Sequence, residues 1–476
     1  MKSNNDIDNQ LYNLNSPNKL IVNSSIFESD CESRYGISLA EKWRNNEELW
    51  CKSNAIEINS QLNCYPYHQK HKQLDGRGPD MFCIANNFVI DFSKVIGKVP
   101  SSKQPLGSQY LSFHKGSLSG ECKMTNKYKE HLFMPHQSLQ MNSFEENYHI
   151  DSNIERYETP LYLMARDEDC ENLFHSTADF MNAYLVISAL QIDPKDLQVM
   201  LFDLHPDGPY IDLIKNAFSP NHPVIRHSHF QNKKILFNKI VFHLESPAGL
   251  IFPKVSRPGP LQCYSTSLFQ NYRKFILKAF NLWDVSPPPI PTITLSLRKR
   301  TDKKNVGRIL QNEDEIVSVL NQGNLIKVQV IDGGKMSFTD QIKLIRHTNI
   351  LIGVHGAGLM MIMFAAEEAI LIEMHPSYRQ DRHFRHAARM TGKIYMPLRT
   401  LTRETCQGSS DNVVIPVQEF KQTVDGAIRI ARSFDDGLSE CGLNCPYEIL
   451  ALDNKLLPFY GNKDKKVSPV NTAFPC

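Results

Sequence analysis

Asn349-Ile-Leu-Ile-Gly-Val-His-Gly-Ala-Gly-Leu359 is the most informative stretch of this 476-residue chain. Its apolar run, 350–354, is typical of a buried β-strand and stops at a turn of small residues. An apolar segment with helical character, 359–366, follows. This order lets the backbone N–H groups of the turn and the helix dipole face an anion. We therefore expect His355, Gly356, Ala357 and Gly358 to form a phosphate-binding turn.

A second strand, Ala369-Ile-Leu-Ile-Glu373, follows shortly and ends in a carboxylate. In nucleotide-binding α/β folds an acid at such a strand end commonly binds ribose hydroxyls, so Glu373 joins the predicted site. The turn is not the dinucleotide fingerprint, because Met361 stands where Gly-x-Gly-x-x-Gly needs its third glycine. A tight crossover in an ordinary parallel sheet is the alternative interpretation of the turn.

Length, composition and charge favour a folded chain of two globular units with extensions. The hydrophobic fraction of 41% and the charged fraction of 22% are typical of folded soluble proteins. A net charge of +2 gives no electrostatic basis for binding nucleic acid. No stretch approaches the length of a membrane-spanning apolar helix. We therefore expect no nucleic-acid partner and no membrane span in this chain.

The eleven cysteines concentrate toward the two ends of the chain. This placement favours disulfides that hold peripheral segments in a protein of the secretory pathway, and buried reduced cysteines are the alternative. Cys441-x-x-x-Cys445 has no histidine at zinc-site spacing, so we predict no structural zinc. The first 30 residues show no signal peptide. Either the protein is cytosolic, or its start lies upstream, or export uses another route.

Strands alternate with helices through the middle of the chain, which predicts mainly parallel sheets. A proline-rich segment interrupts the alternation and cannot continue a helix. Two α/β halves joined by a short linker are expected to place a ligand cleft at the carboxyl ends of their strands. The predicted segments are a disordered tail (1–30), a Cys-rich N-terminal cap or stem (31–150), a first Rossmann-like domain (151–285), the linker (286–291), a second Rossmann-like domain (292–435) and a C-terminal tail (436–476).

Three blocks, in the same order, resemble glycosyltransferase family 61. They are Glu171-Asn-Leu-Phe-His-Ser-Thr-Ala-Asp-Phe180, Arg308-Ile-Leu-Gln-Asn-Glu-Asp-Glu315 and Gly353-Val-His-Gly-Ala-Gly-Leu359. The resemblance spans residues 160–400. Two positions depart from it: Met361 stands where the family commonly has a second histidine, and Phe180 stands where it has tryptophan.

The resemblance implies a GT-B-like fold, in which two Rossmann-like domains face a cleft. It also implies an inverting, UDP-sugar-dependent transferase acting on protein-linked glycans or glycoproteins in the Golgi or ER lumen. The first domain would bind the acceptor and the second the nucleotide sugar. Asn172-Leu-Phe-His175 and Ser246-Pro-Ala-Gly249 look closer to the β-1,2-xylosyltransferases of N-glycans. O-GlcNAc transfer to EGF-like domains is the second expectation, and a degenerate glycan-binding protein is the alternative of another class.

A leaving UDP develops negative charge at its β-phosphate and needs fixed hydrogen-bond donors there. The resemblance and the turn predict that the amides of 356–358, His355, Arg298 and Arg308 supply them, because a guanidinium binds two phosphate oxygens at once. For the arginines, a solvated strand end is the alternative. His375, His383 and His386, just beyond, are expected to be exposed polar helix residues, and a His-rich wall of the acceptor site is the alternative.

Inversion in one displacement needs a base that takes the proton of the acceptor hydroxyl. His175 and Asp179 are four residues apart and share one helix face, so we predict that they form the catalytic pair. A polar helix face used in packing is the alternative. Asp167-Glu-Asp169 resembles a manganese-binding Asp-x-Asp, but acids before a helix also cap it. We predict that no metal and no cofactor is required besides the sugar nucleotide.

Overall fold

The computed structural model describes residues 29–53, 59–66, 81–98, 110–125, 144–166, 170–244, 263–286, 290–298, 308–322, 326–376, 382–399 and 413–435. Several sequence predictions lie outside these residues: both tails apart from residues 29 and 30, Asp167-Glu-Asp169, Ser246–Gly249, and Cys441 with Cys445. The chain divides into two compact units, with the boundary between Trp283 and Asp284 and with residues 263–265 assigned to the second. We call them unit 1 and unit 2.

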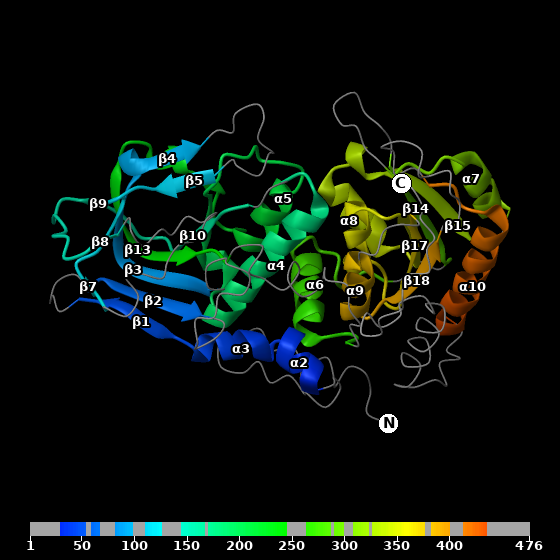
Figure 1. Ribbon diagram of the computed structural model, residues 1–476, viewed down its shortest axis with the longest axis horizontal. Coiled ribbons are helices and arrows are strands. Elements are labelled where there is room, and N and C mark those ends of the chain that lie inside the picture. Colours follow the sequence, from blue (N-terminus) through cyan, green and yellow to red (C-terminus); the bar gives the residue numbers. More distant parts are fainter. Residues whose placement is uncertain are drawn as a thin grey trace, which may run out of the picture. The chain divides into compact units, whose positions relative to one another are not determined.

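Unit 1 contains a mixed 11-stranded sheet (Figure 1). Strands β12, β11, β10 and β13 run parallel, and β3, β2, β1 and β7 continue the sheet in antiparallel pairs. Segments of the expected N-terminal cap and of the following α/β region therefore share one sheet. The strands are β1 (Glu48–Lys52), β2 (Gln61–Pro66), β3 (Met81–Asp91), β6 (Leu118–Ser119), β7 (Lys123–Met124), β8 (Phe144–Glu145), β9 (Glu155–Tyr157), β10 (Leu161–Met164), β11 (Gln198–Leu201), β12 (Ile225–Arg226) and β13 (Lys234–Phe242).

Alternation along β10 sends its residues to opposite faces of this sheet. Leu161 and Leu163 enter a core that is covered by the hairpin of β4 (Val95–Lys98) and β5 (Tyr110–Phe113). Tyr162 lies on the other face, beside helix α4. The helices and short turns are α2 (Ser29–Tyr35), α3 (Ser38–Asn45), η2 (Phe92–Lys94), α4 (Leu173–Leu190), η6 (Pro194–Asp196), α5 (Ile211–Leu213), η7 (Ile214–Phe218), η8 (His227–Phe230) and α6 (Ser267–Ala279).

Helix α4 begins and ends where its sequence requires. The side chain of Asn172 accepts a hydrogen bond from the amide of Phe174 at 3.0 Å, which caps the first turn. Gln191 follows the last turn with a φ of 55°, the left-handed conformation that commonly ends a helix.

Two disulfides brace the N-terminal strands of unit 1. Cys64 and Cys83 face each other in register on β2 and β3 and are bonded, and Cys51 of β1 is bonded to Cys122. Cys31 and Cys263 also belong to disulfides. The prediction of disulfides in the cysteine-rich N-terminal segment is confirmed for its five cysteines, whereas Cys263 lies outside that segment.

Unit 2 is built on a five-stranded, all-parallel sheet in the order β15-β14-β16-β17-β18. This confirms the parallel sheet predicted from the alternation of strands and helices. Helices α7 and α10 lie on one face, and α8, η12 and α9 lie on the other (Figure 1). The elements are β14 (Thr292–Leu297), α7 (Glu313–Asn321), β15 (Lys327–Asp332), η11 (Gly333–Lys335), α8 (Phe338–Arg346), β16 (Ile350–Val354), η12 (Ala357–Phe364), β17 (Ile370–His375), α9 (His383–Met390), β18 (Ile394–Arg399) and α10 (Val417–Asp435).

The helix predicted over 359–366 is present as the 3-10 helix η12, which begins and ends two residues earlier, at Ala357 and Phe364. The connection must return along the whole length of β16, which is about 17 Å for five residues. Eight residues of 3-10 helix span about 16 Å, whereas an α-helix of that length spans only about 12 Å. The tighter helix therefore closes this short crossover.

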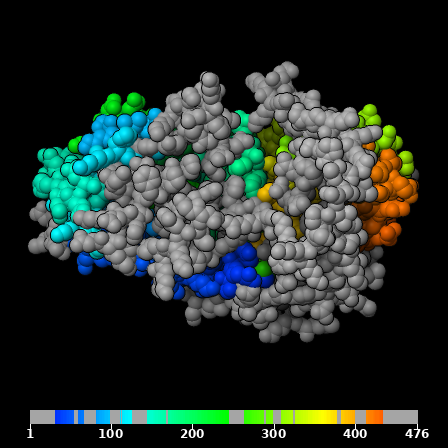
Figure 2. All heavy atoms as spheres, in the orientation of Figure 1, coloured from blue at the N-terminus to red at the C-terminus, as the bar shows by residue number. Residues whose placement is uncertain are grey.

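Helix α10 forms part of the surface of unit 2 (Figure 2). Its inner face places Phe420, Val424 and Ala427 in the core beneath the sheet. Across the described ranges, no helix has both the length and the apolar composition needed to cross a membrane.

Candidate functional site

The register of the parallel strands in unit 2 gathers polar groups on one face of the sheet. Ile352 and Ile372 lie side by side and enter the core under α7 and α10. Residues one position further along each strand point to the opposite face. Glu373 and His375 of β17 therefore share that face with His355, which directly follows β16.

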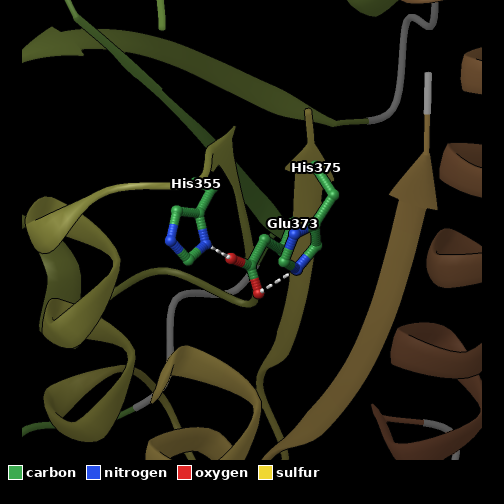
Figure 3. A group of neighbouring side chains, drawn as sticks. All are labelled: His355, Glu373 and His375. Carbon is green, nitrogen blue, oxygen red and sulfur yellow. Dashed lines mark hydrogen bonds and ion pairs between the residues drawn. The ribbon is translucent and has the colours of Figure 1, made fainter. Parts of the chain in front are cut away.

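These three side chains form a buried hydrogen-bonded network (Figure 3). Nδ1 of His355 lies 2.5 Å from Oε1 of Glu373. The other carboxylate oxygen accepts a hydrogen bond from the hydroxyl of Tyr395 at 2.8 Å and lies 3.1 Å from Nε2 of His375. Glu373 is 0% exposed, and both histidines are 2% exposed. Both oxygens of this carboxylate are therefore bonded within the protein.

The charges in the network follow from these contacts. Burial alone would raise the pKa of Glu373, but the two imidazoles and their hydrogen bonds outweigh it and hold the pKa well below the ordinary value. Burial lowers the pKa of His355 more than the adjacent carboxylate raises it, and His375 and Arg308 lower it further. Glu373 is thus ionised and His355 neutral at pH 7. The proton of His355 sits on Nδ1, where the carboxylate accepts it, so Nε2 keeps its lone pair.

The glycine turn overlaps the start of η12, which begins at Ala357 and has Gly356 as its N-cap residue. The first bond of η12 runs from the amide of Leu359 to the carbonyl of Gly356, at 2.9 Å. In the part of the chain that the structure describes, no residue accepts a hydrogen bond from the amides of Gly356, Ala357 or Gly358. Three backbone donors are therefore left beside one another at the carboxyl end of β16.

The two predicted arginines lie next to this turn. A Cβ built on Gly356 would collide with the guanidinium of Arg298, whose Cζ would be 3.0 Å away. Arg308 adopts a φ of 66° and is near enough to His355 to lower its pKa. The structure thus brings Arg298, Arg308, His355, Glu373 and the turn together within unit 2. Their assignment to a bound donor stays a prediction.

Sequence reasoning missed three side chains around His355. His375 follows Glu373 by two positions, and that spacing alone could have placed both on one face of a strand. Tyr395 and Phe384 gave no such signal, and the ring of Phe384 is centred 5.0 Å from that of His355. The expectation that His375 and His386 are exposed was wrong, because they are 2% and 1% exposed.

The predicted catalytic pair lies on α4 of unit 1. Asp179 is 1% exposed and His175 is half-buried. Burial, and then the charge of Asp179, raise the pKa of Tyr162. The same charge favours the protonated form of Arg166, so Asp179 lies in a polar cluster at the carboxyl ends of the parallel strands.

A second pair in this cluster, Arg166 and Asp203, was not expected from the sequence. Arg166 follows β10 and donates from Nε and Nη2 to the two carboxylate oxygens of Asp203, which follows β11, at 2.9 and 2.7 Å. Its Nη1 donates to the carbonyl of Asp207 at 2.8 Å. Because the guanidinium is held on three sides, it braces the strand ends rather than offering a free charge.

His355, Glu373 and His375 are also the described residues that could hold a cation, since their ligand atoms lie within 4.8 Å of one another. Two ligands of a zinc-like ion are about 3 Å or more apart, because each bond to the metal is about 2.1 Å. The 2.5 Å separation of Nδ1 and Oε1 is that of a hydrogen bond. The geometry therefore favours a hydrogen-bonded network over a metal site.

One protein family matches the part of the chain that contains candidate residues of unit 1 and of unit 2. The profile of the family Glycosyltransferase 61 matches residues 157–372, which include His175, Asp179, Arg298, Arg308 and the glycine turn. Curated relatives named EGF domain-specific O-linked N-acetylglucosamine transferase are similar to this chain. The Drosophila melanogaster protein is 26% identical over 395 residues, covering 76% of this chain and 72% of the relative. The Gallus gallus protein is 23% identical over 407 residues, which cover 78% of this chain and 72% of the relative. The Mus musculus protein is 27% identical over 248 residues, which cover 51% of this chain and 45% of the relative.

Proposed function

The chain belongs to glycosyltransferase family 61, and on that premise we propose that it transfers N-acetylglucosamine from UDP-N-acetylglucosamine to a hydroxyl of an EGF-like domain. The sequence blocks had favoured a β-1,2-xylosyltransferase of N-glycans. The relatives are named for the other activity, at identities of 23–27%. Their names therefore support the second expectation over the first.

The glycine turn of unit 2 is the observation that carries this proposal. No described residue accepts a hydrogen bond from the amides of Gly356, Ala357 and Gly358, and the guanidinium of Arg298 lies beside Gly356. Fixed N–H donors and an arginine fork match the oxygens of a diphosphate and stabilise the charge that develops as UDP leaves. Arg308, which is near enough to His355 to lower its pKa, would add a second positive charge.

His355 and Glu373 have different roles in this proposal from those expected. Because neutral His355 keeps a lone pair on Nε2, it suits a hydroxyl of the donor better than a phosphate oxygen. Glu373 is fully buried and bonded to three side chains, which favours positioning of His355 over direct contact with ribose. Tyr395 and His375 would hold that carboxylate in place.

His175 is the proposed base, with Asp179 one helical turn behind it. The acceptor oxygen attacks the anomeric carbon while His175 takes the hydroxyl proton. The bond between the anomeric carbon and the β-phosphate oxygen breaks, and UDP leaves with its electron pair. One displacement of this kind inverts the anomeric configuration.

A transfer assay with purified acceptors tests the proposed function. We expect UDP-N-acetylglucosamine to add one N-acetylhexosamine to a folded EGF-like domain, as read by intact-protein mass. UDP-xylose with an N-glycan acceptor should give no product. Xylose transfer, or the absence of both transfer and UDP release, would reject the assignment.

We also propose that turnover needs no divalent metal. Excess EDTA should change the initial rate by less than about twofold, because amides and arginines supply the charge that a metal supplies in other transferases. The assay must be run after prolonged dialysis against chelator. A rate that disappears and returns with manganese would show instead that a cation acts at the diphosphate.

The two described disulfides support a location in the secretory pathway. Cys64–Cys83 joins two strands of the sheet of unit 1, and Cys51–Cys122 joins β1 to the residue before β7. Bonds of this kind form and persist in oxidising compartments. We therefore propose that the chain acts in the lumen of that pathway, where EGF-like domains are folded.

A further inference from the structure

A tyrosine of β10 and a histidine that directly follows β13 form a buried polar pair in unit 1. Tyr162 of β10 is in register with Val241 of β13, and His243 comes two residues later, on the same face. The hydroxyl of Tyr162 lies 2.7 Å from Nδ1 of His243. The two residues are 1% and 3% exposed, respectively.

The hydrogen bond fixes the tautomer of His243. Burial lowers its pKa to about 3, so the ring is neutral at pH 7. Burial also raises the pKa of Tyr162, which therefore keeps its proton. Among the described residues, Nδ1 of His243 is the partner of this hydroxyl, so the phenol donates to it. The proton of the imidazole must then be on Nε2.

Nε2 is buried and has no hydrogen-bond partner in the described part of the protein. A buried N–H without an acceptor is rare and destabilises the fold, so its presence needs an explanation. The pair of Tyr162 and His243 is built from two elements, β10 and β13. His243 lies at the carboxyl end of β13, and α/β sheets bind ligands at such strand ends. The Nε2–H group of His243 is therefore positioned to donate a hydrogen bond to an oxygen of a bound ligand.

The surrounding charges indicate what kind of oxygen would bind. Arg166 is held in a bidentate pair by Asp203, so it offers no net positive charge. Asp179 is close enough to Tyr162 to raise the pKa of the phenol. An anion would therefore be repelled, whereas a neutral hydroxyl or carbonyl oxygen would not.

We propose that His243, aligned by Tyr162, donates a hydrogen bond from Nε2 to a neutral hydroxyl or carbonyl oxygen of the acceptor substrate. The proposal rests on the proposed function, in which His175 of unit 1 takes the proton of the acceptor hydroxyl. His243 is a binding residue in this scheme, and it moves no proton in the reaction.

Two substitutions of His243 separate binding from structure. The amide nitrogen of glutamine reaches about as far as Nε2, whereas that of asparagine reaches only about as far as Nδ1. His243→Asn should therefore raise the KM for the EGF-like acceptor about tenfold, the effect of losing one hydrogen bond, with kcat within about twofold. His243→Gln should stay within about threefold of wild type.

A higher acceptor KM in His243→Gln than in His243→Asn would overturn the proposal. If His243 served only to satisfy Tyr162, asparagine would be the milder change and glutamine the harsher one, because asparagine keeps a polar atom near Nδ1. An unchanged KM in His243→Asn would also overturn it and would indicate a buried water. A wild-type protein without transfer would reject the proposed function as well, so the two failures are distinguishable.

If His243→Asn does not fold, the Tyr162→Phe variant tests the proposal instead. It removes the hydroxyl that fixes the tautomer, so the KM for the acceptor should rise about threefold with the KM for the sugar nucleotide unchanged. Tyr157→Phe is the matched control, because its hydroxyl bonds to Gln198 at the amino-terminal start of β11. Equal acceptor KM values in Tyr162→Phe and Tyr157→Phe would overturn the proposal.

Discussion

Gly356→Ala is expected to lower the affinity for UDP by about 10- to 100-fold while leaving the unfolding temperature of the ligand-free protein nearly unchanged. The φ of Gly356 is 173°, an extended conformation that any residue adopts, so alanine introduces no backbone strain. The new methyl group would instead collide with the guanidinium of Arg298. A flexible arginine can swing away, and the protein then loses the fork that faces the turn.

The size of this effect follows from the contact that is lost. A charge-assisted hydrogen bond is worth about 1.5–3 kcal/mol, which corresponds to about 10- to 100-fold in affinity. Calorimetric titration with UDP measures it directly. Arg298→Ala should give a similar loss, and the double variant should be no weaker than either single variant, because both changes remove the same interaction.

Gly358→Ala is the matched control in the same turn. A Cβ at Gly358 would meet only Oγ of Ser296, at 3.6 Å, which is ordinary van der Waals contact. Its UDP affinity should stay within about twofold of wild type. Equal losses in both variants would show that the space above the turn, rather than Arg298, determines binding. Wild-type affinity in Gly356→Ala would remove Arg298 from the donor site.

The candidate site residues of unit 2 could be grouped from the sequence because the relevant signals there are local. Runs such as Ile350–Val354 are apolar throughout, as expected of parallel strands buried on both faces. Polar residues that follow such strands then gather at one edge of the sheet. Arg298, His355 and Glu373 could therefore be predicted as neighbours without knowledge of the strand order.

The residues that sequence reasoning missed depend on pairings between distant segments. Tyr395 reaches Glu373 because β18 lies beside β17 with Leu371 opposite Tyr395, and nothing local in the sequence specifies that register. Likewise, β3 extends the sheet of unit 1 by pairing with β13, far along the chain. The 3-10 form of η12 was hidden for another reason: its residues 359–364 are all buried, so no polar face marks a helical period.

His175→Ala is expected to lower kcat by about 100- to 10,000-fold, the usual contribution of a general base, without changing UDP binding. We expect kcat and the affinity for UDP to respond separately, because His175 lies on α4 of unit 1, whereas the glycine turn belongs to unit 2. Added imidazole should restore part of the rate. His222→Ala is the matched control, since this half-buried histidine of unit 1 lies just before β12, away from the strand ends.

The Asp179→Asn variant separates the base from the residue behind it. Asparagine keeps the volume of this buried side chain and removes its charge, so kcat should fall by about tenfold because the imidazolium formed during transfer loses its stabilising carboxylate. Imidazole should not restore this loss, because the base itself is present. If His175→Ala kept kcat within about fivefold of wild type, the proton would have another acceptor. A large loss in Asp179→Asn alone would then assign that role to the carboxylate.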